Sequence, residues 1–221
     1  MARPTLRKPA IIFVTAFIVC IAGWGAWRAV TWFTQREPAP MDTGAMRGVI
    51  IASPALALPA FQLTDGNNRA YTNEQLKNHW TLIYFGYTHC PDICPTTLQT
   101  LAKVTAQLSD TQRNDTQVLF ISLDPKRDSS AIIKDYVAHF DASFTAASAP
   151  ATALHVLTEP LGVIYEFEGD TNKPDYTLNH YGAVFIMDPQ ARLRAYILPP
   201  HEAPRVLEAY TKIRVYYGGH S

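Results

Sequence analysis

The stretch Thr81–Pro95, TLIYFGYTHCPDICP, passes from a short apolar run into a segment that carries two cysteines and a proline. The run Thr81–Phe85 is typical of a buried strand. Pro95 has no amide hydrogen and suits the first position of a helix, so we expect a strand to give way to a helix here. This expectation places Cys94 near the N-cap of the helix and Cys90 in the preceding loop.

The spacing Cys90-x-x-x-Cys94 indicates redox or metal chemistry. Free backbone amides and the positive end of a helix stabilise a thiolate, which predicts a lowered pKa for both thiols. If the segment is turned, the two sulfurs are close enough to form a disulfide or to bind a soft metal ion such as Cu(I) or Zn(II). The chain has 3 cysteines in 221 residues, which excludes a disulfide-rich scaffold. The third, Cys20, lies in an apolar segment and is expected to be a small hydrophobic side chain.

On both sides of this stretch, apolar runs alternate with segments of helical periodicity. Strands are expected at 61–63, 81–85, 118–123, 181–187 and 193–197, and helices at 95–108, 129–139 and 203–217. Strands separated by helices predict βαβ units with a partly parallel sheet, and the last two strands are close enough for an antiparallel hairpin. A βαβ half followed by a ββα half is the thioredoxin-like arrangement. The predicted fold class is therefore α/β, with a thioredoxin-like domain over residues 60–217.

The N-terminus has the pattern of a membrane anchor. Basic residues within positions 1–9 precede an uncharged run, Ala10–Trp27. As a helix this run spans about 27 Å, close to the roughly 30 Å of a hydrocarbon core. We expect a single transmembrane helix at 10–33, with residues 1–9 in the cytoplasm and the domain in the periplasm of a bacterial inner membrane. A cleaved signal peptide is the alternative, but the run is long and no Ala-x-Ala site follows it closely.

Residues 34–59 contain four prolines and predict an extended tether between the anchor and the domain. The apolar stretch Val49–Ile51 within it is a candidate for packing on the domain. Residues 218–221 are expected to be a tail. Lys+Arg and Asp+Glu both total 19, so no broad electrostatic attraction for nucleic acid is expected.

The motif Tyr84–Pro95, YFGYTHCPDICP, resembles the signature of the Sco/SenC family. Members are membrane-tethered, thioredoxin-like proteins that bind copper and help to assemble the binuclear copper centre of cytochrome c oxidase. The similarity covers about residues 60–217 and includes Ser122–Pro125, SLDP. In the family, both motif cysteines and one distant histidine hold copper, which implies a site made of Cys90, Cys94 and His180 for Cu(I) and also Cu(II). The family usually has a serine after this histidine, and Tyr181 leaves the local hydrogen bonding open.

The other polar residues near the motif have plainer interpretations. His89 adjoins Cys90, but neighbours in an extended chain point apart, so an orienting or surface role is expected. Asp124 either approaches the cysteines or caps the turn before the helix near Ser129, and capping is the expected role. The remaining histidines are expected to be packing or exposed groups: His79, His139, His155, His201 and, in the tail, His220.

Two functions follow for such a site. The first is a metallochaperone, because two thiolates and one imidazole leave room for an incoming ligand, so the ion can pass to a partner. The resemblance implies the copper-centre subunit of cytochrome c oxidase as the recipient, together with an upstream copper donor or thiol reductant. The second is a membrane-anchored thiol–disulfide oxidoreductase that keeps the oxidase cysteines reduced.

Sequence details separate the chain from three other classes. Ordinary thioredoxins use Cys-x-x-Cys and place a cis-proline just before the late strand, where the nearest upstream proline here is Pro174. A thiol peroxidase would need Thr-x-x-Cys with a nearby arginine, yet Thr88 is only two residues before Cys90. A structural zinc site is disfavoured because three ligands leave the metal open.

Overall fold

The computed structural model describes residues 39–44 and 46–218, together with Phe17, Ile21, Gly23, Trp24 and Arg28. The chain divides into two units, Met1–Pro38 and Ala39–Ser221. Apart from the five single residues, the predicted anchor at 10–33 lies outside the described part, as do residues 1–9 and residues 219–221. Within the described part, no helix has both the length and the apolar character needed to cross a membrane.

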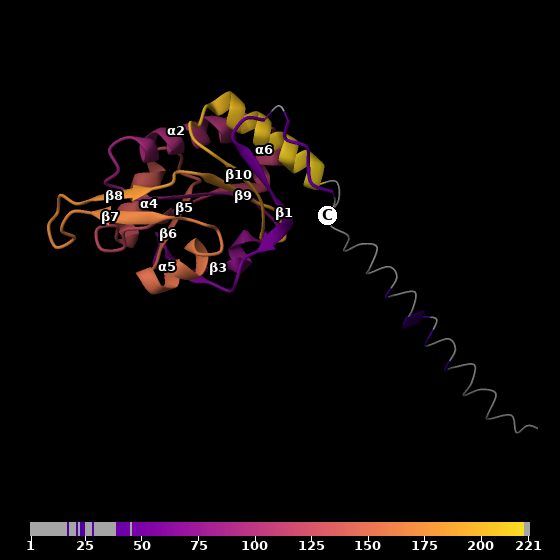
Figure 1. The fold of residues 1–221 in the computed structure, drawn as a ribbon, viewed down its shortest axis with the longest axis horizontal. Coiled ribbons are helices and arrows are strands. Elements are labelled where there is room, and N and C mark those ends of the chain that lie inside the picture. The colour runs from indigo at the N-terminus through magenta and orange to yellow at the C-terminus, as the bar shows by residue number, and fades with distance from the viewer. Residues whose placement is uncertain are drawn as a thin grey trace, which may run out of the picture. The chain divides into compact units, whose positions relative to one another are not determined.

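An eight-stranded sheet forms the centre of the second unit (Figure 1). Its order is β1 (Val49–Ala57), β10 (Arg192–Ile197), β9 (Val184–Met187), β4 (Trp80–Gly86), β5 (Thr116–Ser122), β6 (Thr145–Ser148), β2 (Gln62–Asp65) and β3 (Ala70–Thr72). Strands β4, β5 and β6 run parallel, whereas β9 is antiparallel to both β4 and β10. Every residue of β4 is buried, as expected of a parallel strand that is covered on both faces.

Helices cover this sheet, and the cysteine motif lies between the C-terminal end of β4 and the first helix that follows it. They are α2 (Ile93–Ala106), α3 (Asp110–Asn114), α4 (Ser130–Ala138), α5 (Ala151–Thr158) and α6 (Ala203–Gly218), with a 3₁₀ turn η1 (Asn73–Leu76). Helix α2 packs against α6, and α4 packs against β6 and β2. The unit β4–α2–β5 and the later unit β9–β10–α6 together confirm the predicted thioredoxin-like fold.

The predicted tether at 34–59 is wrong for its second half. Residues Val49–Ala57 form strand β1, which pairs with β10 at the edge of the sheet. The pairing is irregular between Ile51 and Leu56, and Pro54 lies in that interval, where a missing amide hydrogen costs no ladder bond. The folded domain therefore begins before the expected boundary at residue 60.

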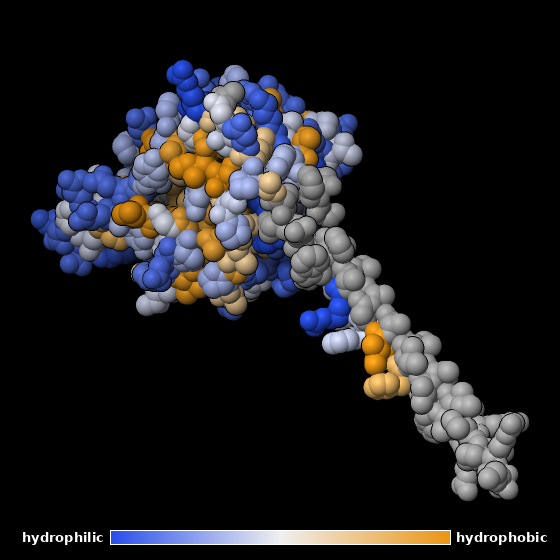
Figure 2. All heavy atoms as spheres, turned by 45° about the vertical axis from the view of Figure 1, so that its right-hand side comes forward, coloured by the Kyte–Doolittle hydropathy of each residue, from blue (hydrophilic) through white to orange (hydrophobic). Residues whose placement is uncertain are grey.

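A second, two-stranded sheet was not expected. Strands β7 (Tyr165–Glu168) and β8 (Thr177–His180) pair as an antiparallel hairpin, with Tyr165 opposite His180. The strand predicted at 181–187 is correspondingly shorter, because β8 ends at His180 and β9 begins at Val184. The far end of the hairpin projects from the domain and is covered with hydrophilic residues (Figures 1 and 2). His180 therefore comes from a different element than the two sulfurs.

Candidate metal site

The two cysteines occupy the connection between β4 and α2. The helix begins at Ile93, so Cys94 is its second residue and Pro95 its third, rather than N-cap and first residue as expected. Pro95 is tolerated there because amide hydrogens in the first turn of a helix have no partner within the helix. Cys94 is fully buried and Cys90 is half-buried, and both are free thiols.

A buried carboxylate, Asp128, fixes the loop before the helix. It accepts hydrogen bonds from the Thr88 amide at 3.0 Å, the Thr88 hydroxyl at 2.5 Å and the Ser122 hydroxyl at 2.5 Å. These bonds tie the cysteine loop to the end of β5. His89 is exposed, and its Nδ1 lies 3.1 Å from the Thr88 hydroxyl, which agrees with the orienting or surface role expected for it.

The structure brings the three predicted ligands together. The Nε2 atom of His180 lies 3.4 Å from the sulfur of Cys94. The ligand atoms of Cys90, Cys94 and His180 all lie within 4.8 Å of one another, and no other such group of three occurs in the described part of the chain. Two sulfurs and one imidazole nitrogen are a donor set that suits copper in either oxidation state.

Asp124 and Arg127 hold the strand that carries His180. Arg127 Nε donates to Asp124 Oδ2 at 2.5 Å, and the Tyr176 hydroxyl donates to Asp124 Oδ1 at 2.7 Å. Arg127 also donates to the carbonyls of Pro174 and Tyr176, and its guanidinium lies 3.5 Å from the centre of the Tyr176 ring. The expected capping role of the Asp124 side chain is therefore wrong. Ser129 caps α4, and the Asp124 carboxylate fixes the start of β8.

The two thiols differ in acidity, which corrects the expectation that both pKa values are lowered. A hydrogen bond from the Cys94 thiol lowers the pKa of Cys90 to about 4, and a smaller contribution comes from His180. The same bond and the burial of Cys94 raise the pKa of Cys94, because a second negative charge would lie beside the first without water. Because the two groups share a proton, the pair loses its first proton readily and its second with difficulty.

Two tyrosines line the site. The rings of Tyr84 and Tyr87 meet the His180 ring edge-on, with centroids 6.1 and 6.3 Å away. The Tyr84 hydroxyl lies 3.7 Å from the sulfur of Cys94, and the Tyr87 hydroxyl accepts a hydrogen bond from the Leu178 amide at 3.4 Å. Sequence reasoning missed both residues, although Tyr84 and Tyr87 lie within the quoted motif.

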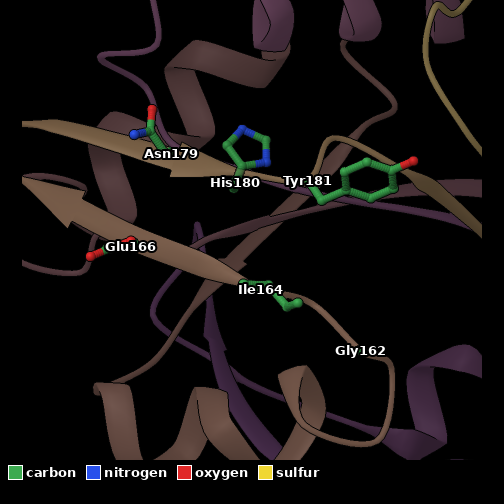
Figure 3. A pocket seen from close by; sticks show the side chains of 6 residues that line it. All are labelled: Gly162, Ile164, Glu166, Asn179, His180 and Tyr181. Atoms are coloured by element: carbon green, nitrogen blue, oxygen red, sulfur yellow. The ribbon is translucent and has the colours of Figure 1, made fainter.

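On the side of the His180 ring away from the sulfurs, Nδ1 is buried and has no hydrogen-bond partner among the described residues. The side chain of Tyr181, which follows it, is 53% exposed, and its hydroxyl points away from the ring (Figure 3). A pocket of about 540 Å³ lies beside His180 and Tyr181 and is also lined by Ile164 and Glu166. The open question about hydrogen bonding after His180 is thus answered: Tyr181 supplies none to the imidazole.

Within the part of the chain that the structure describes, the other histidines do not join the ligand group. His201 is held through both nitrogens, by the Thr97 hydroxyl at 3.1 Å and the Ile197 carbonyl at 3.0 Å. His155 lies 3.4 Å from the Glu159 carboxylate, while His139 stacks edge-on against Phe140. His79 Nδ1 lies 2.9 Å from the Lys77 carbonyl. His220 lies outside the described residues.

Comparison with known proteins shows which protein family has this combination of fold and site. The sequence pattern of the SCO1/SenC family matches residues 52–214. The chain belongs to this family. A putative copper-binding protein of Stutzerimonas stutzeri is 32% identical over 163 residues, which cover 72% of this chain and 79% of that protein.

Solved structures of the SCO1/SenC family agree in fold. Bradyrhizobium japonicum ScoI with copper bound has a TM-score of 0.62 and 32% identity, and the match covers 72% of this chain and 99% of the other. Arabidopsis thaliana ScoI with copper bound has a TM-score of 0.67 and 26% identity, and the match covers 72% and 98%. The family match thus includes Cys90, Cys94 and His180 within residues 52–214.

Proposed function

We propose that the protein is a copper metallochaperone that binds copper through Cys90, Cys94 and His180. It passes the ion to the copper-centre subunit of cytochrome c oxidase. The observation that carries the proposal is the convergence of these two sulfurs and one imidazole nitrogen within 4.8 Å of one another. The copper bound to two structures of similar fold supports copper over zinc as the ion.

The chain's own residues explain how the ion can be both held and released. Cys90 is an anionic ligand before the metal arrives, because its pKa is about 4. Cys94 must lose its proton when copper binds, so binding releases a proton. Among the described residues the site has only these three ligands, and Cys90 is half-buried, so a ligand of the recipient can reach the ion and replace one of them.

The test is a copper titration of the reduced protein. We expect about one Cu(I) per chain, as a single three-ligand site implies. His180→Ala should bind more weakly, while Cys90→Ser should lose tight binding. His155→Ala is the matched control, because it removes an exposed imidazole that is not part of the ligand group. Copper affinity that is indifferent to His180 would contradict the proposed site, and a higher affinity for zinc would contradict the assignment of copper.

A thiol–disulfide oxidoreductase is the second candidate. The specific observation in its favour is the half-buried Cys90, whose thiolate forms at low pH beside a second free thiol. In that role the protein would reduce the cysteines of the oxidase subunit before copper arrives. Reduction of a disulfide substrate by the protein, unchanged in His180→Ala, would favour this candidate over the carrier.

We further propose that residues 10–33 anchor the protein in the bacterial inner membrane. The domain would then face the periplasm. The support is the uncharged run Ala10–Trp27 and the basic residues that precede it. Fractionation of cells, followed by extraction of the membranes with carbonate, tests this proposal. Release of the protein into the soluble fraction would contradict it.

A further inference from the structure

Tyr84 places a phenol hydroxyl inside the core, directly against the buried sulfur. It lies in β4, where Val184 and Phe120 are its partners on the flanking strands, and its side chain is fully buried. A buried tyrosine hydroxyl needs a hydrogen-bond partner, because water is excluded. The Tyr84 hydroxyl donates to the sulfur of Cys94, with an oxygen-to-sulfur distance of 3.7 Å.

The backbone around this contact is shaped to allow it. A Cβ atom on Gly86 would lie 2.8 Å from the sulfur of Cys94, closer than real contacts permit. A Cβ atom on Gly182 would lie 3.3 Å from the Tyr84 hydroxyl and 3.1 Å from Ile93. Two glycines thus leave the space that the sulfur and the hydroxyl share.

The hydroxyl also belongs to a short polar line through the core. Thr97 interacts with it, and the Thr97 hydroxyl lies 3.1 Å from Nδ1 of His201. His201 Nε2 lies 3.0 Å from the Ile197 carbonyl, which can only accept, so Nε2 carries a hydrogen and Nδ1 of the neutral ring accepts from Thr97. The Thr97 proton is therefore used by His201, and the single proton of the Tyr84 hydroxyl is donated to the sulfur of Cys94.

We propose that Tyr84 is a positioning residue that sets the electron density on the sulfur of Cys94. A hydrogen bond to a thiolate draws charge away from the sulfur and stabilises its more negative states. On a copper-bound sulfur this favours Cu(I) over Cu(II), since the higher oxidation state needs stronger donation. In the metal-free protein it favours the reduced pair over the disulfide, because the Cys94 sulfur that shares its proton with the Cys90 thiolate carries more negative charge than a disulfide sulfur and accepts a hydrogen bond better. The copper part of this inference rests on the proposed function, whereas the disulfide part does not.

The experiment compares the wild type with Tyr84→Phe and Tyr210→Phe. Tyr210 is also fully buried, and its hydroxyl bonds Thr116 at 2.5 Å, so its variant controls for the loss of a buried hydroxyl. In Tyr84→Phe the preference for Cu(I) over Cu(II) should fall about tenfold, which corresponds to about 59 mV for a one-electron couple. The sulfur-to-Cu(II) absorption band should move to longer wavelength. Without metal, the equilibrium with glutathione should move toward the Cys90–Cys94 disulfide.

Two further outcomes decide the inference. If Tyr84→Phe matches Tyr210→Phe in the copper couple, the absorption band and the glutathione equilibrium, the inference is overturned while the copper carrier stands. If the wild type binds no copper, the proposed function fails and the glutathione equilibrium alone decides the role of Tyr84. Replacement of Tyr84 by 3-fluorotyrosine keeps the shape of the ring but strengthens the donor. It should move the same quantities in the opposite direction, even if the phenylalanine variant does not fold.

Discussion

The two halves of the metal site are held in different ways. The sulfurs lie where a fully buried strand of the main sheet meets α2, and three hydrogen bonds of Asp128, two from Thr88 and one from Ser122, tie their loop to the end of β5. The imidazole lies on a two-stranded hairpin outside that sheet, and a hairpin of this kind is marginally stable alone. The contacts of Asp124 and Arg127 with residues Pro174–Tyr176, called the hairpin contacts below, therefore fix the position of His180, as the core fixes the positions of the sulfurs. For the proposed copper carrier, we expect release of the ion to begin at the imidazole while both sulfurs keep their places.

The largest loss of Cu(I) affinity is expected when one of the two sulfur ligands is removed. Cys94→Ser replaces a soft, fully buried ligand with a hydroxyl that binds Cu(I) poorly. Loss of a group that merely supports a metal ligand costs about 10–100-fold in affinity, so loss of this ligand should cost more. Competition with a Cu(I) chelator measures it. A smaller loss in Cys94→Ser than in His180→Ala would reverse the ranking of the two halves.

The next largest loss of copper affinity is expected when the hairpin contacts are broken. Asp124→Asn breaks a buried ion pair and leaves Arg127 without its carboxylate, which should lower the free energy of unfolding by about 3 kcal/mol. Because the pair fixes the start of β8, copper affinity should also fall, by about 10–100-fold. Urea denaturation and chelator competition measure the two quantities.

Asp188→Asn is the matched control for this variant. Asp188 is equally buried and pairs with Arg192 and Arg194 on β10, away from the site. It should lose similar stability but keep its copper affinity. If both variants lose affinity alike, general destabilisation explains the effect, and the hairpin contacts have no special role.

Sequence reasoning was strongest where the chemistry is local. The cysteine motif, the strand before it and the helix after it could be predicted because the signals lie within fifteen residues, Thr81–Pro95. The role of His180 came from the family resemblance, since the distance along the chain says nothing about contact. The hairpin was missed because β7 is exposed along most of its length and gives no buried alternating pattern.

The roles of Asp124 and the two thiols could not be predicted for a related reason. The contact between Asp124 and Tyr176 joins residues 52 positions apart and depends on how the connection between β5 and α4 meets the hairpin. The raised pKa of Cys94 depends first on its hydrogen bond with Cys90 and then on its complete burial, and a helix-start argument includes neither. The helix-start argument predicted the lowered pKa of Cys90 and overlooked that the Cys90 thiolate raises the pKa of Cys94.

The pKa of Cys90 shows how strongly His180, on the hairpin, affects the acidity of this thiol. The pKa of Cys90 is lowered from 9.0 to about 4, mainly by Cys94 and to a smaller degree by His180. The thiolate is therefore present at neutral pH and is lost as the pH falls through about 4. The rate of alkylation by iodoacetamide, followed against pH in Cys94→Ala and His180→Ala, separates the two causes. We expect the midpoint to rise in both variants, and to rise further without Cys94.

The smallest effect is expected from Tyr176→Phe, which removes only one donor from the hairpin contacts. The Tyr176 hydroxyl lies 2.7 and 2.9 Å from the two oxygens of Asp124, but the ring would keep its place against Arg127. A hydrogen bond to a charged group contributes about 1.5–3 kcal/mol. Copper affinity should nevertheless fall only a few-fold, because Arg127 still holds the carbonyls of Pro174 and Tyr176.

The double variant Asp124→Asn with Tyr176→Phe shows whether the two residues act as one unit. If they do, the second change should add little to the first, because the donor has already lost its charged acceptor. Chelator competition on the four proteins of this cycle measures the coupling. Fully additive losses would mean that Tyr176 supports His180 by a route that does not pass through Asp124, and the hairpin would then be held by two independent contacts.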